Sequence, residues 1–154
     1  SETTAGGLIV GALFAVNAFG EIVDSSNGST VAGPRDLDGG FLDTTEILRN
    51  VMPPPSASNT TIGIVATNAR LTKEQVNRLA TVAHDGLARA IRPAHTLADG
   101  DIVFSLATGD APATSPAELR ALEVLAARAT ERAIVKAIRA ATTVAGVPAV
   151  RDLQ

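Results

Sequence analysis

Thr60 is the residue whose type and position in this sequence could support nucleophilic catalysis. It follows Asn59 and the Pro/Ser-rich residues 53–58, and it stands just before the apolar run Ile62–Ala66. If the Asn59–Thr60 peptide is cut, Thr60 becomes a chain terminus that carries both a hydroxyl nucleophile and an α-amine base. The unperturbed pKa of an α-amine is about 7.7 to 8.0, which suits a general base near neutral pH. A Thr at a strand edge after a linker is the ordinary alternative, and the residues alone favour it.

Three further polar side chains could assist such a nucleophile. Asp99 and Asp101 flank Gly100, so in an extended chain both carboxylates lie on one side, where they can hydrogen-bond a hydroxyl and an ammonium group. Asn17 follows an apolar run, and its amide could donate to a developing oxyanion or hold the nucleophile. The ordinary alternatives are an Asp-Gly turn before a strand and a strand-ending Asn that bonds its own backbone.

The remaining polar and glycine motifs predict no metal or cofactor site. His84 falls among the polar positions of an expected helix and His95 in a turn, so we interpret both as structural. Two histidines this far apart make no metal motif. The pairs Gly6–Gly7 and Gly39–Gly40 lack phosphate-loop spacing and are typical of loops. We therefore expect the chemistry to need neither a cofactor nor a metal ion.

The segment before Thr60 predicts a hairpin, a loop and a short helix. Residues 8–16 form an apolar run typical of a strand covered on both faces, and residues 21–24 predict a short strand that folds back on it. Residues 25–40 are rich in Gly, Ser, Asn, Pro and Asp, which predicts a long loop. Capping-box spacing over residues 43–46 predicts one or two helical turns, and residues 53–58 then form an exposed connector.

The segment after Thr60 alternates strands and helices. Apolar runs predict strands over residues 62–66 and 102–107. A capping box over residues 72–75 starts a helix expected from Lys73 to Ile91, and Ser115-Pro116-Ala117-Glu118 starts a second that continues to roughly Ala141. The tail beyond Gly146 is expected to be loose. This order predicts an α/β mixture in which helices cover a sheet.

Composition limits the classes of function. The 154 residues, 45% of them hydrophobic, suffice for one core and one domain. A net charge of −3 and only four Phe, with no Trp or Tyr, exclude a nucleic-acid partner because there is neither a basic patch nor a stacking platform. The absence of cysteine removes thiolate chemistry and is compatible with the cytoplasmic location that we expect. The sequence contains no run of about 18 apolar residues, so we expect no membrane span.

Four separated blocks carry a family resemblance, and they are residues 10–20, 59–68, 83–91 and 95–101. In this order they resemble the self-processing N-terminal-nucleophile aminopeptidase family. It includes L-aminopeptidase/D-amidase-esterases, β-peptidyl aminopeptidases and 6-aminohexanoate-oligomer endo-hydrolases. Its members are precursors that cut themselves into a large α part and a small β part. The resemblance implies an αββα-type layered sandwich, of which this chain is the C-terminal portion, and a tetramer of αβ units.

The resemblance also implies a division of this chain at the Asn59–Thr60 peptide. Residues 1–59 are similar to the C-terminal piece of an α part, and residues 60–154 to a complete β part, both within one domain. The remainder of the α part is then an expected partner, either as the rest of a longer chain or as another chain. That remainder would bring a lysine or tyrosine that helps line the family's active site.

By the same resemblance, Thr60 is the nucleophile, Asn17, Asp99 and Asp101 are its catalytic neighbours, and Thr61 is a minor rival. A Thr with Asp-x-Asp is typical of the oligomer-hydrolase branch, whereas the aminopeptidase branch uses Ser with Ser-x-Glu. The implied function is hydrolysis of short peptides or related amides, such as aminohexanoate oligomers, through an acyl-enzyme. One alternative is acetyl transfer, as in the ornithine acetyltransferases, which also cut before a Thr. The other is a non-catalytic α+β interaction module.

Overall fold

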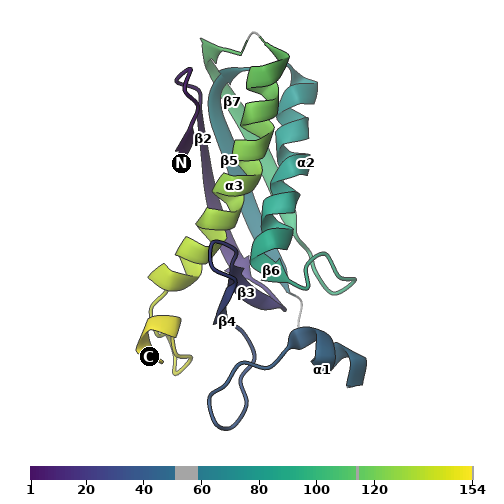
Figure 1. The fold of residues 1–154 in the computed structure, drawn as a ribbon, viewed down its shortest axis with the longest axis vertical. Helices are drawn as coiled ribbons and strands as arrows, with labels where there is room; N and C mark the ends of the chain where they lie inside the picture. The colour runs from purple at the N-terminus through teal and green to yellow at the C-terminus, as the bar shows by residue number, and fades with distance from the viewer. Residues whose placement is uncertain (51–58, 114, 154) are drawn as a thin grey trace.

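The computed structural model describes residues 1–50, 59–113 and 115–153. The connector predicted over residues 53–58 lies outside these ranges. Four strands form the main sheet in the order β1 (Glu2–Thr3), β2 (Ile9–Asn17), β5 (Thr60–Arg70) and β7 (Ile102–Pro112). Strand β2 runs antiparallel to β5, and β5 runs parallel to β7 (Figure 1). The predicted strands over residues 8–16, 62–66 and 102–107 are therefore confirmed, and the last two are longer than predicted.

Two long helices connect and follow the parallel strands. Helix α2 (Lys73–Ala90) joins β5 to β7, because parallel neighbours need a crossover connection. Helix α3 (Pro116–Ala140) follows β7. Both predicted capping boxes are present: the Thr72 side chain pairs with Gln75, and the Ser115 side chain with Glu118. Local capping and apolar spacing thus determine where both helices begin.

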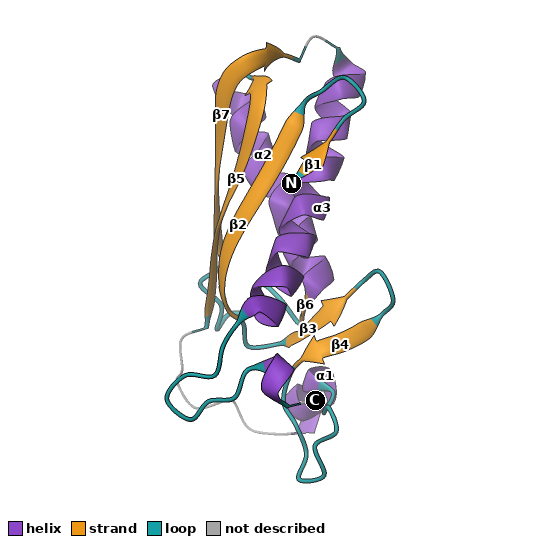
Figure 2. Cartoon of the chain, turned by 90° about the vertical axis from the view of Figure 1, so that its left-hand side faces the viewer, coloured by secondary structure: helices purple, strands orange, loops and turns teal. Residues whose placement is uncertain are grey.

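Both helices cover the same face of the main sheet, as the side view in Figure 2 shows. Side chains alternate along each strand, so every second residue of β5, including Thr61, Gly63 and Val65, is buried beneath the helices. The core between sheet and helices consists mostly of aliphatic side chains: Leu8, Val10, Phe14, Val65, Leu79, Leu87, Leu122 and Ile134. Gly86 of α2 marks the close contact between the helices, since a Cβ built on it would lie 2.0 Å from the Ala127 carbonyl oxygen of α3.

The opposite face of the sheet is open and apolar. Its large side chains are between 40% and 73% exposed, and they are Ile9, Leu13, Ile62, Ile102, Phe104 and Leu106. We call these six residues the open face. In the described residues only the helix side of β2 is covered, and cover on both faces of residues 8–16 stays a prediction for the complete protein.

A smaller sheet corrects the predicted hairpin. Strand β3 (Glu21–Asp24) lies between β4 (Ser29–Ala32) and β6 (Ile91–Arg92), and it does not pair with β2. Both edges of β2 are already occupied by β1 and β5, so β3 has no free edge there. Gly20 lies just before β3 and packs closely against Arg92 of β6. A Cβ at this position would lie 2.4 Å from the Arg92 carbonyl oxygen, so the close approach requires glycine.

Residues 25–40 are likewise not a single loop, because they contain β4. The turn between β3 and β4 uses Asn27 and Gly28, and Gly28 has a φ of +74° that favours glycine. The predicted short helix is confirmed as α1 (Thr44–Asn50), and Asp43 accepts a hydrogen bond from the Thr45 N–H at 2.7 Å. The tail expected to be loose contains a short 3₁₀ turn, Val150–Asp152. Within the described ranges, every helix is too short or too polar for a membrane crossing.

Candidate active site

The predicted catalytic residues meet at one end of the main sheet, where β2 ends and β5 and β7 begin. Asn17 is the last residue of β2 and lies directly opposite Thr60, the first residue of β5, in the antiparallel register. On the other side of β5, Asn59 pairs with Asp99 in the segment that leads into β7. The sheet thus brings together Asn17, Asn59, Thr60, Asp99 and Asp101, which are far apart in the sequence.

The pleat of β5 separates Thr60 from Thr61. Thr61 points to the helix side, is completely buried, and has a hydroxyl without a hydrogen-bond partner in the described part of the chain. Thr60 is partly exposed and belongs to the alternate set of residues, with Ile62, on the open face. Only Thr60 therefore presents its hydroxyl where a substrate could approach from that side.

The carbonyl oxygen of Asn59 is the focus of the hydrogen bonds at this site. The Thr60 hydroxyl donates to it at 2.6 Å, and the Gly100 N–H donates to it at 2.9 Å. The hydroxyl thus lies beside the carbonyl group of the peptide that precedes its own residue. Both contacts have normal hydrogen-bond lengths.

The two carboxylates are held by backbone N–H groups. Asp99 accepts from the Thr96 N–H at 2.7 Å, and Asp101 accepts from the Thr61 N–H at 2.8 Å. Asp101 is therefore fixed beside the first residues of β5, while Asp99 closes the turn before Gly100. The structure brings both carboxylates to the Thr60 end of the sheet, and their catalytic roles stay predictions.

The structure also brings together His84 and His95, which sequence reasoning treated as separate. His84 Nδ1 of α2 lies 3.0 Å from His95 Nε2, and the ring centroids are 5.0 Å apart. The sequence does not reveal this pair, because His95 reaches α2 only through the loop before β7, where its φ is 58°. No group of three or more metal-ligating side chains occurs in the ranges that the structure describes.

The pKa of His84 lies below its ordinary value. Partial burial is the main cause, and the neighbouring His95 adds to it, while Asp101 and Asp85 act in the opposite direction. Because the unfolded chain then takes up the proton more readily, His84 stabilises the fold above about pH 6.5, and this contribution is lost as the pH falls.

We therefore expect the melting temperature to fall between about pH 7.5 and pH 5.5, and His84→Gln to reduce this fall. Melting temperatures of both proteins, measured at several pH values in that window, test the expectation. An unchanged pH slope in His84→Gln would contradict it. His84→Gln should have little effect on the slope above about pH 7.5, where the histidine is neutral in both states.

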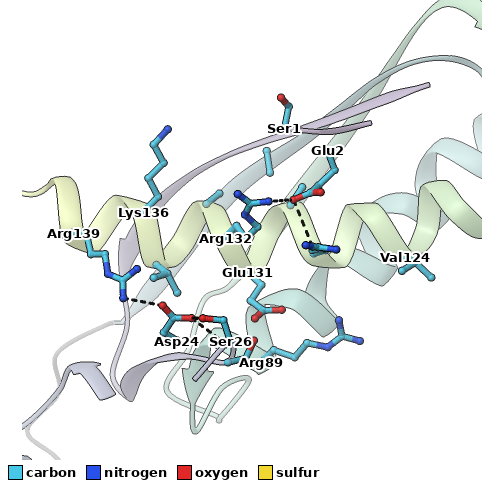
Figure 3. A pocket seen from close by; sticks show the side chains of 16 residues that line it. Ser1, Glu2, Asp24, Ser26, Arg89, Val124, Glu131, Arg132, Lys136 and Arg139 are labelled. Atoms are coloured by element: carbon cyan, nitrogen blue, oxygen red, sulfur yellow. Dashed lines mark hydrogen bonds and ion pairs between the residues drawn. The ribbon is translucent and has the colours of Figure 1, made fainter. Parts of the chain in front are cut away.

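A cavity of about 860 Å³ lies along α3, away from this site (Figure 3). Its lining is rich in cations, namely Arg89, Arg128, Arg132, Lys136 and Arg139. Glu2 pairs with Arg128 and Arg132, and Asp24 pairs with Arg139 at 2.8 Å. Hydrogen bonds from Ser26 are the main cause of a lowered pKa of Asp24. None of the predicted catalytic residues lines this cavity, so we do not assign the chemistry to it.

Comparison with known proteins gives the family. The profile of peptidase family S58 matches residues 1–151. The chain belongs to peptidase family S58. The resemblance derived from the four sequence blocks is thereby confirmed.

The mycobacterial relatives match this chain over nearly its whole length, and an oligomer hydrolase matches a shorter part of it. The chain is 41% identical to an uncharacterized aminopeptidase of Mycobacterium leprae over 96% of its own length and 45% of that protein. It is 35% identical to the 6-aminohexanoate-oligomer endohydrolase of Paenarthrobacter ureafaciens over 61% of its length and 28% of that protein. The chain therefore spans about half the length of the curated aminopeptidases that it matches.

A solved structure supports the predicted fold class. The L-aminopeptidase D-Ala-esterase/amidase of Ochrobactrum anthropi, described as a variant of the Ntn hydrolase fold, superposes with a TM-score of 0.52. The match covers 91% of this chain and 42% of that one, at 19% identity. The α/β fold class predicted from the sequence is thus confirmed, and in the described residues α2 and α3 form a helical layer on one face of the main sheet.

Proposed function

We propose that the complete protein is a self-processing amide hydrolase in which Thr60 is the N-terminal nucleophile. The observation that carries this proposal is the contact of 2.6 Å between the Thr60 hydroxyl and the carbonyl oxygen of Asn59. The hydroxyl lies against the carbonyl group that it would attack, on the partly exposed side of β5. Membership of a peptidase family supports the same class of chemistry.

Maturation follows from this geometry. The Thr60 hydroxyl oxygen bonds to the Asn59 carbonyl carbon, the peptide C–N bond breaks, and the hydroxyl proton ends on the Thr60 nitrogen. Water then hydrolyses the resulting ester, which frees the Asn59 carboxylate and restores the hydroxyl. The new α-amine serves as the general base for later turnovers, since an unperturbed α-amine has a pKa of about 7.7 to 8.0.

In the mature enzyme, Thr60 attacks a substrate amide and forms an acyl-enzyme that water hydrolyses. Asp101 holds the first backbone N–H after the nucleophile, and we assign it the role of orienting Thr60 and its ammonium form. Asp99 fixes the turn that carries Gly100. Asn17 lies opposite Thr60, where its amide could donate to substrate or oxyanion.

The substrate class that we propose is short peptides and related amides. The names of the relatives support it, because they include aminopeptidases and 6-aminohexanoate-oligomer endohydrolases. The combination of Thr60 with Asp99 and Asp101 favours the oligomer-hydrolase pattern, although the higher identity is to the mycobacterial aminopeptidase. Hydrolysis of amino-acid amides and of aminohexanoate oligomers, measured side by side, separates the two substrate groups.

Intact mass of the complete protein tests the processing step. We expect two pieces whose masses place the cut between Asn59 and Thr60, and N-terminal sequencing of the smaller piece should begin Thr60-Thr61. A chain that stays uncut and inactive would instead support a non-catalytic module. A cut protein that moves acetyl groups between amino acids, without hydrolysing amides, would support the transferase alternative.

The remainder of the protein is the partner that we propose for the open face. Monomeric proteins rarely leave a contiguous apolar surface of this kind uncovered, and the chain spans only about half of its curated relatives. A second sheet packed there would complete an αββα sandwich, with Thr60, the first residue of β5, at the end of the covered face. Assembly into tetramers of αβ units and a cytoplasmic location stay predictions.

Leu13→Glu tests this partner, because Leu13 is 73% exposed at the centre of the open face. In the complete protein we expect lower solubility and a melting temperature reduced by several degrees, since the charge would be buried without a partner. Leu37→Glu is the matched control, because Leu37 is fully exposed outside the open face and should tolerate the change. Equal melting temperatures for the two variants would contradict the proposed cover.

A further inference from the structure

Gly100 lies against the proposed scissile peptide in two ways. Its N–H donates to the Asn59 carbonyl oxygen at 2.9 Å, and its α-carbon lies so close to the nucleophile that an added Cβ would be 2.9 Å from Thr60 Oγ1. Its φ lies outside the left-handed region, so backbone conformation alone does not require glycine here. The close approach to the Thr60 hydroxyl gives a direct reason for the missing side chain.

The hydrogen bond directs the Gly100 N–H at the oxygen on which an oxyanion would form. Effective donors lie about 2.7 to 3.1 Å from the position of the oxyanion, and the ground-state carbonyl oxygen of Asn59 lies 2.9 Å from the Gly100 nitrogen. When Thr60 Oγ1 attacks the Asn59 carbonyl carbon, the negative charge develops on the carbonyl oxygen that already accepts from Gly100. The donor is a backbone group held by the Asn59–Asp99 pairing and by the Thr96 to Asp99 turn, so little reorganisation accompanies the attack.

We propose that the Gly100 N–H is an oxyanion donor for cleavage of the Asn59–Thr60 peptide and again for substrate turnover. This inference rests on the proposed function. In both reactions an acyl group becomes bonded to the same atom, Thr60 Oγ1. The carbonyl oxygen of a substrate acyl group therefore occupies the position that the Asn59 carbonyl oxygen leaves after cleavage. In each tetrahedral intermediate the C–O⁻ accepts from Gly100, and collapse of the intermediate expels the amine.

The decisive experiment replaces this N–H with an ester oxygen. Glycolic acid introduced at position 100 by in vitro translation of the complete protein converts the Asp99–Gly100 amide into an ester. Lactic acid at position 98 is the matched control, because the Ala98 N–H faces Thr96 Oγ1 at 3.3 Å and not the Asn59 carbonyl. The measured quantity is the rate at which the intact mass splits at Asn59–Thr60.

We expect the ester at position 100 to slow cleavage by a factor on the order of 10² to 10³, and the ester at position 98 to leave it within a few-fold of the natural chain. Similar rates for the two esters would overturn the proposal. Melting temperatures of both esters in a Thr60→Ala background test whether the fold is retained. With the fold retained, slow cleavage reports the lost N–H and not unfolding. If the natural chain itself does not split, the proposed function fails, and this outcome is distinct from a failure of the Gly100 assignment.

Gly100→Ala gives an independent readout. This variant keeps the N–H but places a methyl group 2.9 Å from Thr60 Oγ1, so the hydroxyl must move. We expect slower cleavage than in the natural chain. A second variant, Ala98→Gly, changes the same turn without approaching Thr60 and should split at the natural rate. Natural cleavage in Gly100→Ala would contradict the close packing on which the assignment depends.

Discussion

Thr60→Ala should abolish cleavage of the complete protein at residues 59–60 and lower amide hydrolysis by a factor on the order of 10⁶. The hydroxyl that contacts the Asn59 carbonyl oxygen at 2.6 Å is removed, and the neighbouring Thr61 hydroxyl of β5 is buried on the other face. Intact mass gives the first result, and steady-state kinetics on an amino-acid amide gives the second. The variant should remain folded, because Thr60 is not part of the buried core.

Two neighbouring substitutions control this experiment. Thr60→Ser keeps a hydroxyl at the same position and should retain cleavage at a reduced rate. Thr61→Val replaces a buried hydroxyl that has no partner in the described ranges, so it should leave cleavage intact and stability equal or higher. If cleavage is instead lost in Thr61→Val and retained in Thr60→Ala, the nucleophile is Thr61 and the assignment of Thr60 is wrong.

Gly86→Ala should lower the free energy of unfolding by about 2 to 3 kcal/mol. The new Cβ would lie 2.0 Å from the Ala127 carbonyl oxygen and 2.9 Å from the Thr130 Cβ, so α2 and α3 must separate. In an exposed helix the same substitution would stabilise by about 1 kcal/mol, which makes the sign of the effect informative. For a domain of this size the melting temperature should fall by roughly 5 to 10 °C.

Gly6→Ala is the control for this prediction. A Cβ at Gly6 would have its nearest neighbours at 3.7 and 3.8 Å, which is ordinary contact, and its φ lies outside the left-handed region. We expect a change within about 0.5 kcal/mol. Equal effects of the two substitutions, measured by denaturant unfolding, would show that the helices can separate at Gly86 without cost.

The parts of the fold that local chemistry determines were predictable from the sequence. Capping boxes at Thr72 and Ser115, followed by apolar residues at helical spacing, are sufficient to place α2 and α3. The proximity of the candidate site residues was predictable for a related reason, because Thr60 begins β5 while Asp99 and Asp101 lie in the segment just before β7. The resemblance in turn supplied the reason to combine them.

The missed features all depend on partners distant in sequence. Strand β3 pairs with β6, a two-residue strand that precedes Pro93 and has no periodicity of its own. The contact of His84 with His95 depends on how one loop folds against α2. The open face could not be foreseen either, since a continuous apolar strand looks the same in sequence whether its cover comes from the same segment or from elsewhere.

The ladder between β2 and β5 has a further consequence. Eight residue pairs, from Val10–Thr67 to Asn17–Thr60, join segments on opposite sides of the proposed cut. Once the Asn59–Thr60 peptide is hydrolysed, these pairs hold two separate polypeptides in one sheet, and refolding becomes a bimolecular reaction. The mature protein would then regain its structure in a concentration-dependent way, and its persistence would depend on how slowly it unfolds. When both proteins are denatured and then refolded by dilution, the uncut Thr60→Ala chain should therefore recover a larger folded fraction than the processed protein.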